Sequence, residues 1–235
     1  MKKIILLGLC FQLYCFVPII AQTGSVLDID GNAYRTVKIG NQIWMAENLR
    51  TSRYRDGDSI PEISDRKAWE NTQSGASSHY QNNQSEFGEK YGKLYNWHAV
   101  STGKLCPKGW HVPGDEEWQA LERHIGMSED LIATVGARGW DQQWDGKLKS
   151  ADKGAWHTDR DYYSNETGFT ALPAGYRTHT GTFQFIRQFG HWWTSSADNE
   201  AMAWKRHLSY YRDIINRNTM LKNAGLCVRC VKDES

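Results

Sequence analysis

Several short stretches of the chain alternate hydrophobic and polar positions with a period of two, which is typical of half-buried β-strands. Residues 34–39 and 203–211 alternate in this way, and residues 190–195 and 226–231 are also predicted to be strands. The turn sequence Asp30-Gly31-Asn32 comes just before the first of these stretches, as in a hairpin. The pattern therefore predicts short antiparallel sheets.

The period changes to that of a helix after Asp115. Trp118, Leu121 and Ile125 recur at spacings of three and four, so they lie on one face of a helix. A helix of this length is marginal on its own, because most helical stability in proteins comes from packing of an apolar face. We therefore expect this face to be buried against a sheet.

The remaining segments are less regular. A second short helix is predicted between residues 127 and 139, with Leu131, Ile132 and Val135 turned inward. Residues 51–90 are rich in Asn, Gln, Ser and Gly and are predicted to be mainly loop, with one or two short helical turns. Together the patterns predict an α+β fold, in the form of an irregular, loop-rich domain with short antiparallel sheets and one or two short helices.

The most unusual composition lies between residues 140 and 163, where large aromatic rings are spread among Asp, Gln, Lys and Gly. Such rings can form a stacking surface for sugars, because a ring face offers apolar contact and its polar neighbours supply hydrogen bonds. The alternative, which is favoured for each Trp, is that the rings fill a core with little regular structure. The candidate ligand-binding residues are Trp140, Trp144, Trp156, Tyr162 and Tyr163.

The first 21 residues are predicted to be a signal peptide. Lys2 and Lys3 give a positive start, residues 4–20 are almost entirely apolar, and Ala21 is a small residue at the expected cleavage position. A retained membrane anchor is the alternative, because about 17 apolar residues are close to the minimum for spanning a bilayer. Cleavage is favoured, so we expect an exported single domain at residues 22–235, without a membrane span, in the periplasm, at the cell surface or outside the cell.

Charge and motifs exclude several functions. The formal net charge of +1 gives no long-range attraction to nucleic acid, the eight histidines show no zinc-ligand spacing, and no Gly-x-Ser-x-Gly elbow is present. Glu116 and Glu117 are adjacent on a helix and point about 100° apart, so they cannot face each other across a glycosidic bond. Asp28 and Asp30 could begin a calcium loop, but a hairpin turn is favoured because the closing glutamate is missing. No catalytic residue, metal site or cofactor is predicted.

Four ordered parts of the chain resemble a bacterial exported family. They are QIWMAENL at 42–49, CPKGWHVP at 106–113 with DEEW at 115–118, GFTALPAGYR at 168–177, and WWTSS at 192–196 with VRCVKD at 228–233. This chain resembles the Fibrobacter succinogenes major paralogous domain and, more distantly, formylglycine-generating-enzyme-like domains. Both groups have folds related to C-type lectins, so the resemblance implies a C-type-lectin-like architecture.

Three cysteines follow the predicted cleavage site, at Cys106, Cys227 and Cys230. Export places them in an oxidising compartment, and an odd number leaves one without an intramolecular partner. The resemblance implies a disulfide between Cys106 and Cys230, which would stabilise the domain by roughly 4 to 5 kcal/mol. The alternative is a Cys-x-x-Cys redox pair at Cys227 and Cys230.

These features together predict a non-catalytic recognition module whose ligand is a polysaccharide or a cell-surface protein. Two alternatives stay open. The first is an oxidase of formylglycine-generating type, which the resemblance links to a pair of cysteines near the chain end that bind copper. The second is a purely structural component of the cell envelope.

Overall fold

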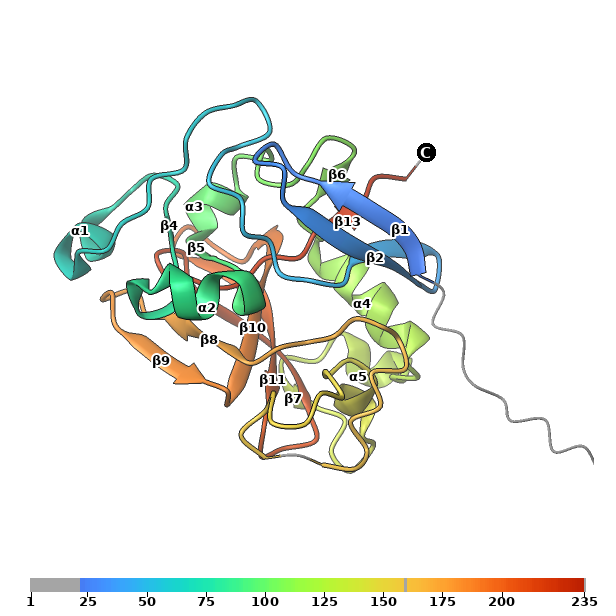
Figure 1. The fold of residues 1–235 in the computed structure, drawn as a ribbon. Coiled ribbons are helices and arrows are strands. Elements are labelled where there is room, and N and C mark those ends of the chain that lie inside the picture. Colours follow the sequence, from blue (N-terminus) through green and yellow to red (C-terminus); the bar gives the residue numbers. More distant parts are fainter. Residues whose placement is uncertain (1–21, 159, 235) are drawn as a thin grey trace, which may run out of the picture.

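The computed structural model describes residues 22–158 and 160–234, and it has a mixed α+β fold in which short sheets are joined by long loops (Figure 1). This confirms the predicted fold class. The predicted signal peptide, residues 1–21, lies outside the described residues. Within the part that is described, no helix is both long and apolar enough to cross a membrane.

The first sheet brings the two ends of the described chain together, and all of its neighbouring strands are antiparallel. In spatial order its strands are β1 (Gln22–Leu27), β2 (Ala33–Ile39), β3 (Gln42–Met45), β13 (Val231–Lys232) and β6 (Trp110–His111). Strand β2 confirms the strand predicted at residues 34–39. The strand predicted at 226–231 is shorter than expected, because Leu226 and Cys227 form only isolated bridges before β13 begins.

The second sheet has six strands and contains the strand that alternation predicted at residues 203–211 and the strand predicted at residues 190–195. In spatial order they are β7 (Gly136–Arg138), β12 (Ile215–Leu221), β11 (Met202–Ser209), β10 (Phe189–Ala197), β8 (Ala174–Arg177) and β9 (Phe183–Ile186). Strands β10 and β8 are parallel, and the other neighbours are antiparallel. A small third sheet pairs β4 (Ser77–Ser78) with β5 (Leu94–Tyr95).

Short helices cover the sheets. They are α1 (Arg66–Asn71), α2 (Gln84–Tyr91), α3 (Trp97–Val100), α4 (Asp115–His124), α5 (Glu129–Ile132) and the 3₁₀ turns η1 (Tyr80–Asn82) and η2 (Trp144–Lys147). Helix α4 confirms the predicted helix. The helix predicted between 127 and 139 is limited to the four residues of α5, and Val135 is exposed because the chain turns at Gly136 into β7.

Helix α4 packs on the second sheet through its apolar face and through buried ion pairs. Trp118 and Leu121 are buried, as predicted. Glu122, one residue further, is also buried and receives hydrogen bonds from Arg138 of β7 (2.8 and 2.7 Å) and Arg206 of β11 (2.7 Å). Burying a carboxylate is costly unless it is paired, so these contacts fix the position of the helix on the sheet.

The disulfide between Cys106 and Cys230 is present, with Cα atoms 5.9 Å apart, which confirms the pairing that the resemblance implied. It links the segment before β6 to the residue just before β13. Cys227 is free and buried, and burial raises the pKa of its thiol to about 12. Because Cys230 is already paired, Cys227 and Cys230 do not form the alternative redox pair.

Candidate functional site

Two of the five candidate aromatic residues lie in the core. Trp156 and Tyr163 are buried and surround the ammonium group of Lys149, which lies 4.9 Å and 4.5 Å from the centres of their rings. Lys149 is itself fully buried and pairs with Asp145. The two rings therefore shield a buried ion pair and offer no face to a ligand in this conformation, as the core interpretation of the sequence predicts.

Two further candidates are half-buried. The ring of Trp144 covers Gly139, where an added Cβ would lie 2.7 Å from the ring. Tyr162 donates a hydrogen bond from its hydroxyl group to Asp213, and the guanidinium group of Arg160 lies 5.9 Å from the centre of its ring. Both side chains therefore pack mainly against other loop residues.

The fifth candidate, Trp140, is exposed and belongs to a larger aromatic surface. Arg212 lies over its ring at 5.1 Å and over the ring of Tyr211 at the same distance, so the guanidinium group joins the two rings. Tyr211 contacts Phe189 of β10, with ring centres 5.9 Å apart. Phe189 in turn contacts Phe185 of β9 at 5.1 Å. This chain of contacts continues to Tyr176 and His191, on the side of the second sheet that faces away from α4.

We call this surface the aromatic face. It comprises Trp140, Tyr176, Phe185, Phe189, His191, His207, Tyr211 and the bridging Arg212. Alternation along the strands sets its direction: Trp192 and Arg206 point to α4, whereas their neighbours His191 and His207 point to the opposite side.

The aromatic face collects the exposed rings of the protein. Within the part of the chain that the structure describes, the aromatic residues with an exposed side chain are Trp140 (51%), Tyr211 (47%) and Phe185 (42%). All three lie on this face. Large aromatic side chains usually bury their rings, so this grouping of exposed ones singles out the aromatic face as a candidate site.

An unusual backbone conformation turns Phe185 outward. Residues two apart in a strand normally share a side, yet Phe183 packs inward against Tyr80, with ring centres 5.4 Å apart, while Phe185 stacks on Tyr176 at 6.0 Å. The cause is a left-handed φ of 63° at Phe185, a conformation that is rare for a bulky residue and is often found at functional sites. Gly175 makes room for it, because a Cβ there would lie 2.4 Å from the carbonyl oxygen of Gln184.

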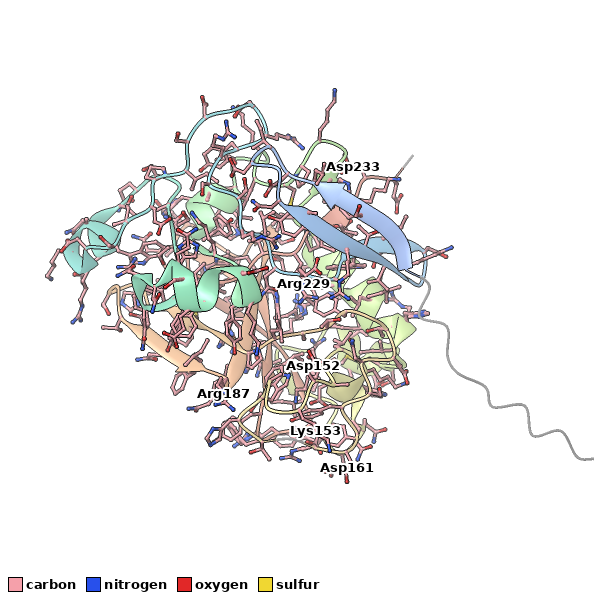
Figure 2. All side chains as sticks on the ribbon, viewed as in Figure 1. Asp152, Lys153, Asp161, Arg187, Arg229 and Asp233 are labelled. Atoms are coloured by element: carbon pink, nitrogen blue, oxygen red, sulfur yellow. A yellow bond between two sulfur atoms is a disulfide. The ribbon has the colours of Figure 1, made fainter. Side chains whose placement is uncertain are left out.

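Polar side chains surround and underlie the rings. Arg187, in the turn after β9, is exposed and donates to the carbonyl oxygen of Gly154, and Figure 2 shows it near the loop that carries Asp152 and Lys153. At the face itself, the guanidinium group of Arg212 supplies hydrogen-bond donors between the rings of Trp140 and Tyr211. The face therefore combines apolar ring surfaces with a polar group that can contact hydroxyl groups.

Lys205 lies beneath the face, with its Nζ 2.9 Å from Nδ1 of His207. Burial lowers the pKa of Lys205 to about 7, and it also lowers the pKa values of His191 and His207 far below their usual range. The charge of Lys205 lowers these two histidine values further. At neutral pH the two histidines are therefore neutral, while Lys205 is about half protonated.

Sequence reasoning identified Trp140 but missed the rest of the aromatic face. Alternation placed residues 203–211 in a strand, so the sequence could have predicted that His207 and Tyr211 lie on the same side of it. The direction of Phe185 was not, because a left-handed residue within a strand reverses the expected side. The local signal that remained was the sequence Phe183-Gln184-Phe185, with two rings close to a turn.

The other carboxylates considered as candidate functional groups make structural hydrogen bonds. The carboxylate of Asp28 accepts hydrogen bonds from the backbone of Asp30 and Asn32 (both 2.9 Å) and from the hydroxyl group of Tyr34 (2.6 Å), which makes the turn at 28–32 a closed hairpin connection. Glu117 accepts from the backbone N–H of Gly114 at 2.7 Å. The residues described by the structure include no cluster of three or more His, Cys, Asp or Glu side chains arranged to hold a metal ion.

Comparison with protein families gives one result. Residues 37–232 match the model of the Fibrobacter succinogenes major domain, a range that includes the whole second sheet and both cysteines of the disulfide but not β1. Comparison with curated proteins and with solved structures finds no match.

Proposed function

We propose that this chain, which belongs to the Fibrobacter succinogenes major domain family, is an exported, non-catalytic recognition module that binds polysaccharide through its aromatic face. The main support is the position of the exposed aromatic rings of the described residues: Trp140, Phe185 and Tyr211 all lie on this one face. Export is part of the proposal and rests on the signal-peptide pattern of residues 1–21.

The chemistry of the face suits a sugar chain. The two faces of a sugar ring differ from its rim, because C–H groups cover the faces while hydroxyl groups project from the rim. Aromatic rings can stack on the C–H groups, and the guanidinium group of Arg212 can bind the hydroxyl groups. A row of rings over a flat sheet fits an extended polymer better than a small enclosed ligand.

The test is a binding screen of residues 22–235 against a glycan array and insoluble plant and microbial polysaccharides. The double variant Phe185→Ala/Tyr211→Ala should weaken binding to the selected polysaccharide at least about tenfold, which corresponds to about 1.4 kcal/mol. The matched control is Leu27→Ala on β1, which removes a more exposed apolar side chain from the first sheet and should leave affinity unchanged.

Two results would count against the proposal. If no glycan binds, a surface protein or a structural role becomes the better explanation. If a glycan binds and the double variant binds it as tightly as the wild type, the aromatic face is not the binding surface. Sequencing of the mature N-terminus should give Gln22 as the first residue, and a chain that keeps residues 1–21 would refute the predicted cleavage.

A further inference from the structure

A second feature of the protein has the properties of a ligand site and lies apart from the aromatic face. It is a cavity of about 700 Å³ between the turn that joins β1 to β2, the segment at residues 50–52, and helix α2. The side chains that matter here are Asp30, Arg50, Ser52, His79, Glu89 and Lys93. None of the rings of the aromatic face lines this cavity.

Two nearly fully buried polar side chains reach this cavity, and Glu62 holds both of them. One Glu62 carboxylate oxygen accepts a hydrogen bond from Nζ of Lys93 at 2.8 Å, and the other lies 3.0 Å from Nδ1 of His79. Burial opposes ionisation of Glu62, but the hydrogen bond and charge of Lys93, together with the hydrogen bond of His79, outweigh it and keep the pKa of Glu62 below its usual value. Glu62 is therefore ionised and can only accept hydrogen bonds.

This arrangement fixes the direction of His79. Because Glu62 only accepts, Nδ1 of His79 must carry the proton in that contact, and Nε2 is an acceptor when the ring is neutral. Nε2 has no hydrogen-bond partner among the described residues. It lies beside Gly88 of α2, where an added Cβ would be 3.2 Å away, so the glycine leaves this nitrogen uncovered at the cavity wall.

Lys93 and Arg50, which line the same cavity, have N–H groups that are not used in hydrogen bonds within the described residues. The ammonium group of Lys93 has three N–H bonds and uses two of them, on Glu62 and on the hydroxyl group of Ser52 at 2.8 Å. Arg50 donates to Asn32 (3.3 Å) and to the carbonyl oxygen of Ala33 (3.1 Å), which leaves further N–H bonds for a ligand.

The charges at this cavity nearly cancel. Lys93 pairs with Glu62, and Asp30 pairs with Arg53 at 2.6 Å. The remaining cation, Arg50, is balanced by Glu89 at the exposed rim. What remains is hydrogen-bonding capacity of both kinds, and hydroxyl groups satisfy both kinds because each one donates and accepts.

We propose that this cavity is a second ligand site, which binds an uncharged, hydroxyl-rich molecule of the size of one or two sugar rings. A hydroxyl group of the ligand donates to Nε2 of His79, and others accept from Lys93 and Arg50. The site does not depend on the aromatic face, because it uses different residues and has no aromatic platform.

The experiment is a titration of ¹⁵N-labelled residues 22–235 with glucose, galactose, mannose, xylose and cellobiose, followed by NMR. Glucuronate and glucosamine serve as charged counterparts of similar shape. We expect saturable shifts of the backbone amides of Ser85, Gly88 and Lys93 with at least one neutral sugar, and at least tenfold weaker binding of its charged counterparts.

Two variants locate the binding. Ser85→Trp places a large ring at the exposed rim of the cavity without touching the buried Glu62 contacts, and it should reduce affinity at least tenfold, whereas Ser85→Ala should not. His79→Phe removes both ring nitrogens, and with them the acceptor, and should weaken binding if the variant remains folded. Phe185→Ala should leave these shifts unchanged.

The proposal is wrong if none of the neutral sugars produces saturable shifts at the cavity. It is also wrong if the shifts persist in Ser85→Trp, or if charged and neutral sugars bind equally well. If the protein binds no polysaccharide through the aromatic face but does bind a neutral sugar in the cavity, only the proposed function is contradicted. The proposed function and the cavity proposal can therefore be refuted independently.

Discussion

The buried position of Lys205 predicts that the free energy of unfolding depends strongly on pH. Lys205 is buried on β11 beneath the aromatic face, and burial, aided by the neighbouring charge of Arg206, lowers its pKa from 10.5 to about 7. The groups that face it are His191 on β10 and His207 on β11, which burial keeps neutral, and the residue opposite on β12 is Asn218. Within the described residues Lys205 forms no ion pair with a carboxylate.

The sign follows from proton binding. Between about pH 7 and pH 10.5 the unfolded chain holds the Lys205 proton and the folded protein does not, so stability rises with pH across this window. Below about pH 7 Lys205 is protonated in both the folded and the unfolded state, so the buried charge lowers the free energy of unfolding by its full amount. A difference between 10.5 and about 7, at about 1.4 kcal/mol per pH unit, makes this cost on the order of 5 kcal/mol.

The test compares urea unfolding of the wild type and Lys205→Met at several pH values across this window. The variant removes the titrating amine, so its stability relative to the wild type should be greatest near pH 7 and should fall by several kcal/mol as the pH approaches 10.5. Changes in packing add an offset that does not depend on pH. Lys38→Met, at an exposed position of β2, is the control and should show no such slope. A relative stability of Lys205→Met that stays constant across the window would refute the reasoning.

Three further predictions concern stability and reactivity. The double variant Cys106→Ser/Cys230→Ser opens a link across 124 residues and should lower the free energy of unfolding by up to about 5 kcal/mol in chemical denaturation; an unchanged value would contradict the chain-entropy argument. Because burial raises the pKa of Cys227 to about 12, a maleimide should label this thiol only after unfolding, and rapid labelling of the native protein would show that the thiol is accessible. Glu122→Leu leaves two buried arginines without their shared carboxylate and should cost about 3 to 5 kcal/mol, whereas Glu116→Leu, exposed on the same helix, should change stability by less than about 0.5 kcal/mol; equal effects would argue against the ion network.

Local periodicity predicted the regular elements well. Helix α4 buries Trp118 and Leu121 on one face, and strand β2 buries Tyr34 and Ile39 while it exposes Arg35 and Lys38; a repeating apolar pattern is the signal of such one-sided burial. Strand β10, in contrast, is buried on both sides from Gly190 to Thr194. Helix α2 was missed because its sequence is mostly polar and its start depends on Asn83, whose side chain accepts from the backbone of Glu86 at 3.2 Å. A cap of this kind has a weak signature inside a polar region.

The candidate site was predicted only in part, because the sequence does not record which long-range partners the rings have. Trp156 and Tyr163 are buried because they surround Lys149. Phe185 is exposed because one left-handed residue reverses the side to which it points. The pairing of Cys106 with Cys230 followed from the family resemblance, since three cysteines alone leave several pairings open.

Hydroxyl-radical footprinting, with and without the polysaccharide selected by the screen, tests the central claim most directly. It measures the oxidation rate of individual side chains, so it reports which surface the ligand covers. If the aromatic face binds the chain, then Trp140, Phe185 and Tyr211 should all be oxidised more slowly in the complex, while Leu27 and Val135, which are at least as exposed, should react at unchanged rates. Unchanged oxidation of the three aromatic residues, with protection elsewhere on the protein, would contradict the account.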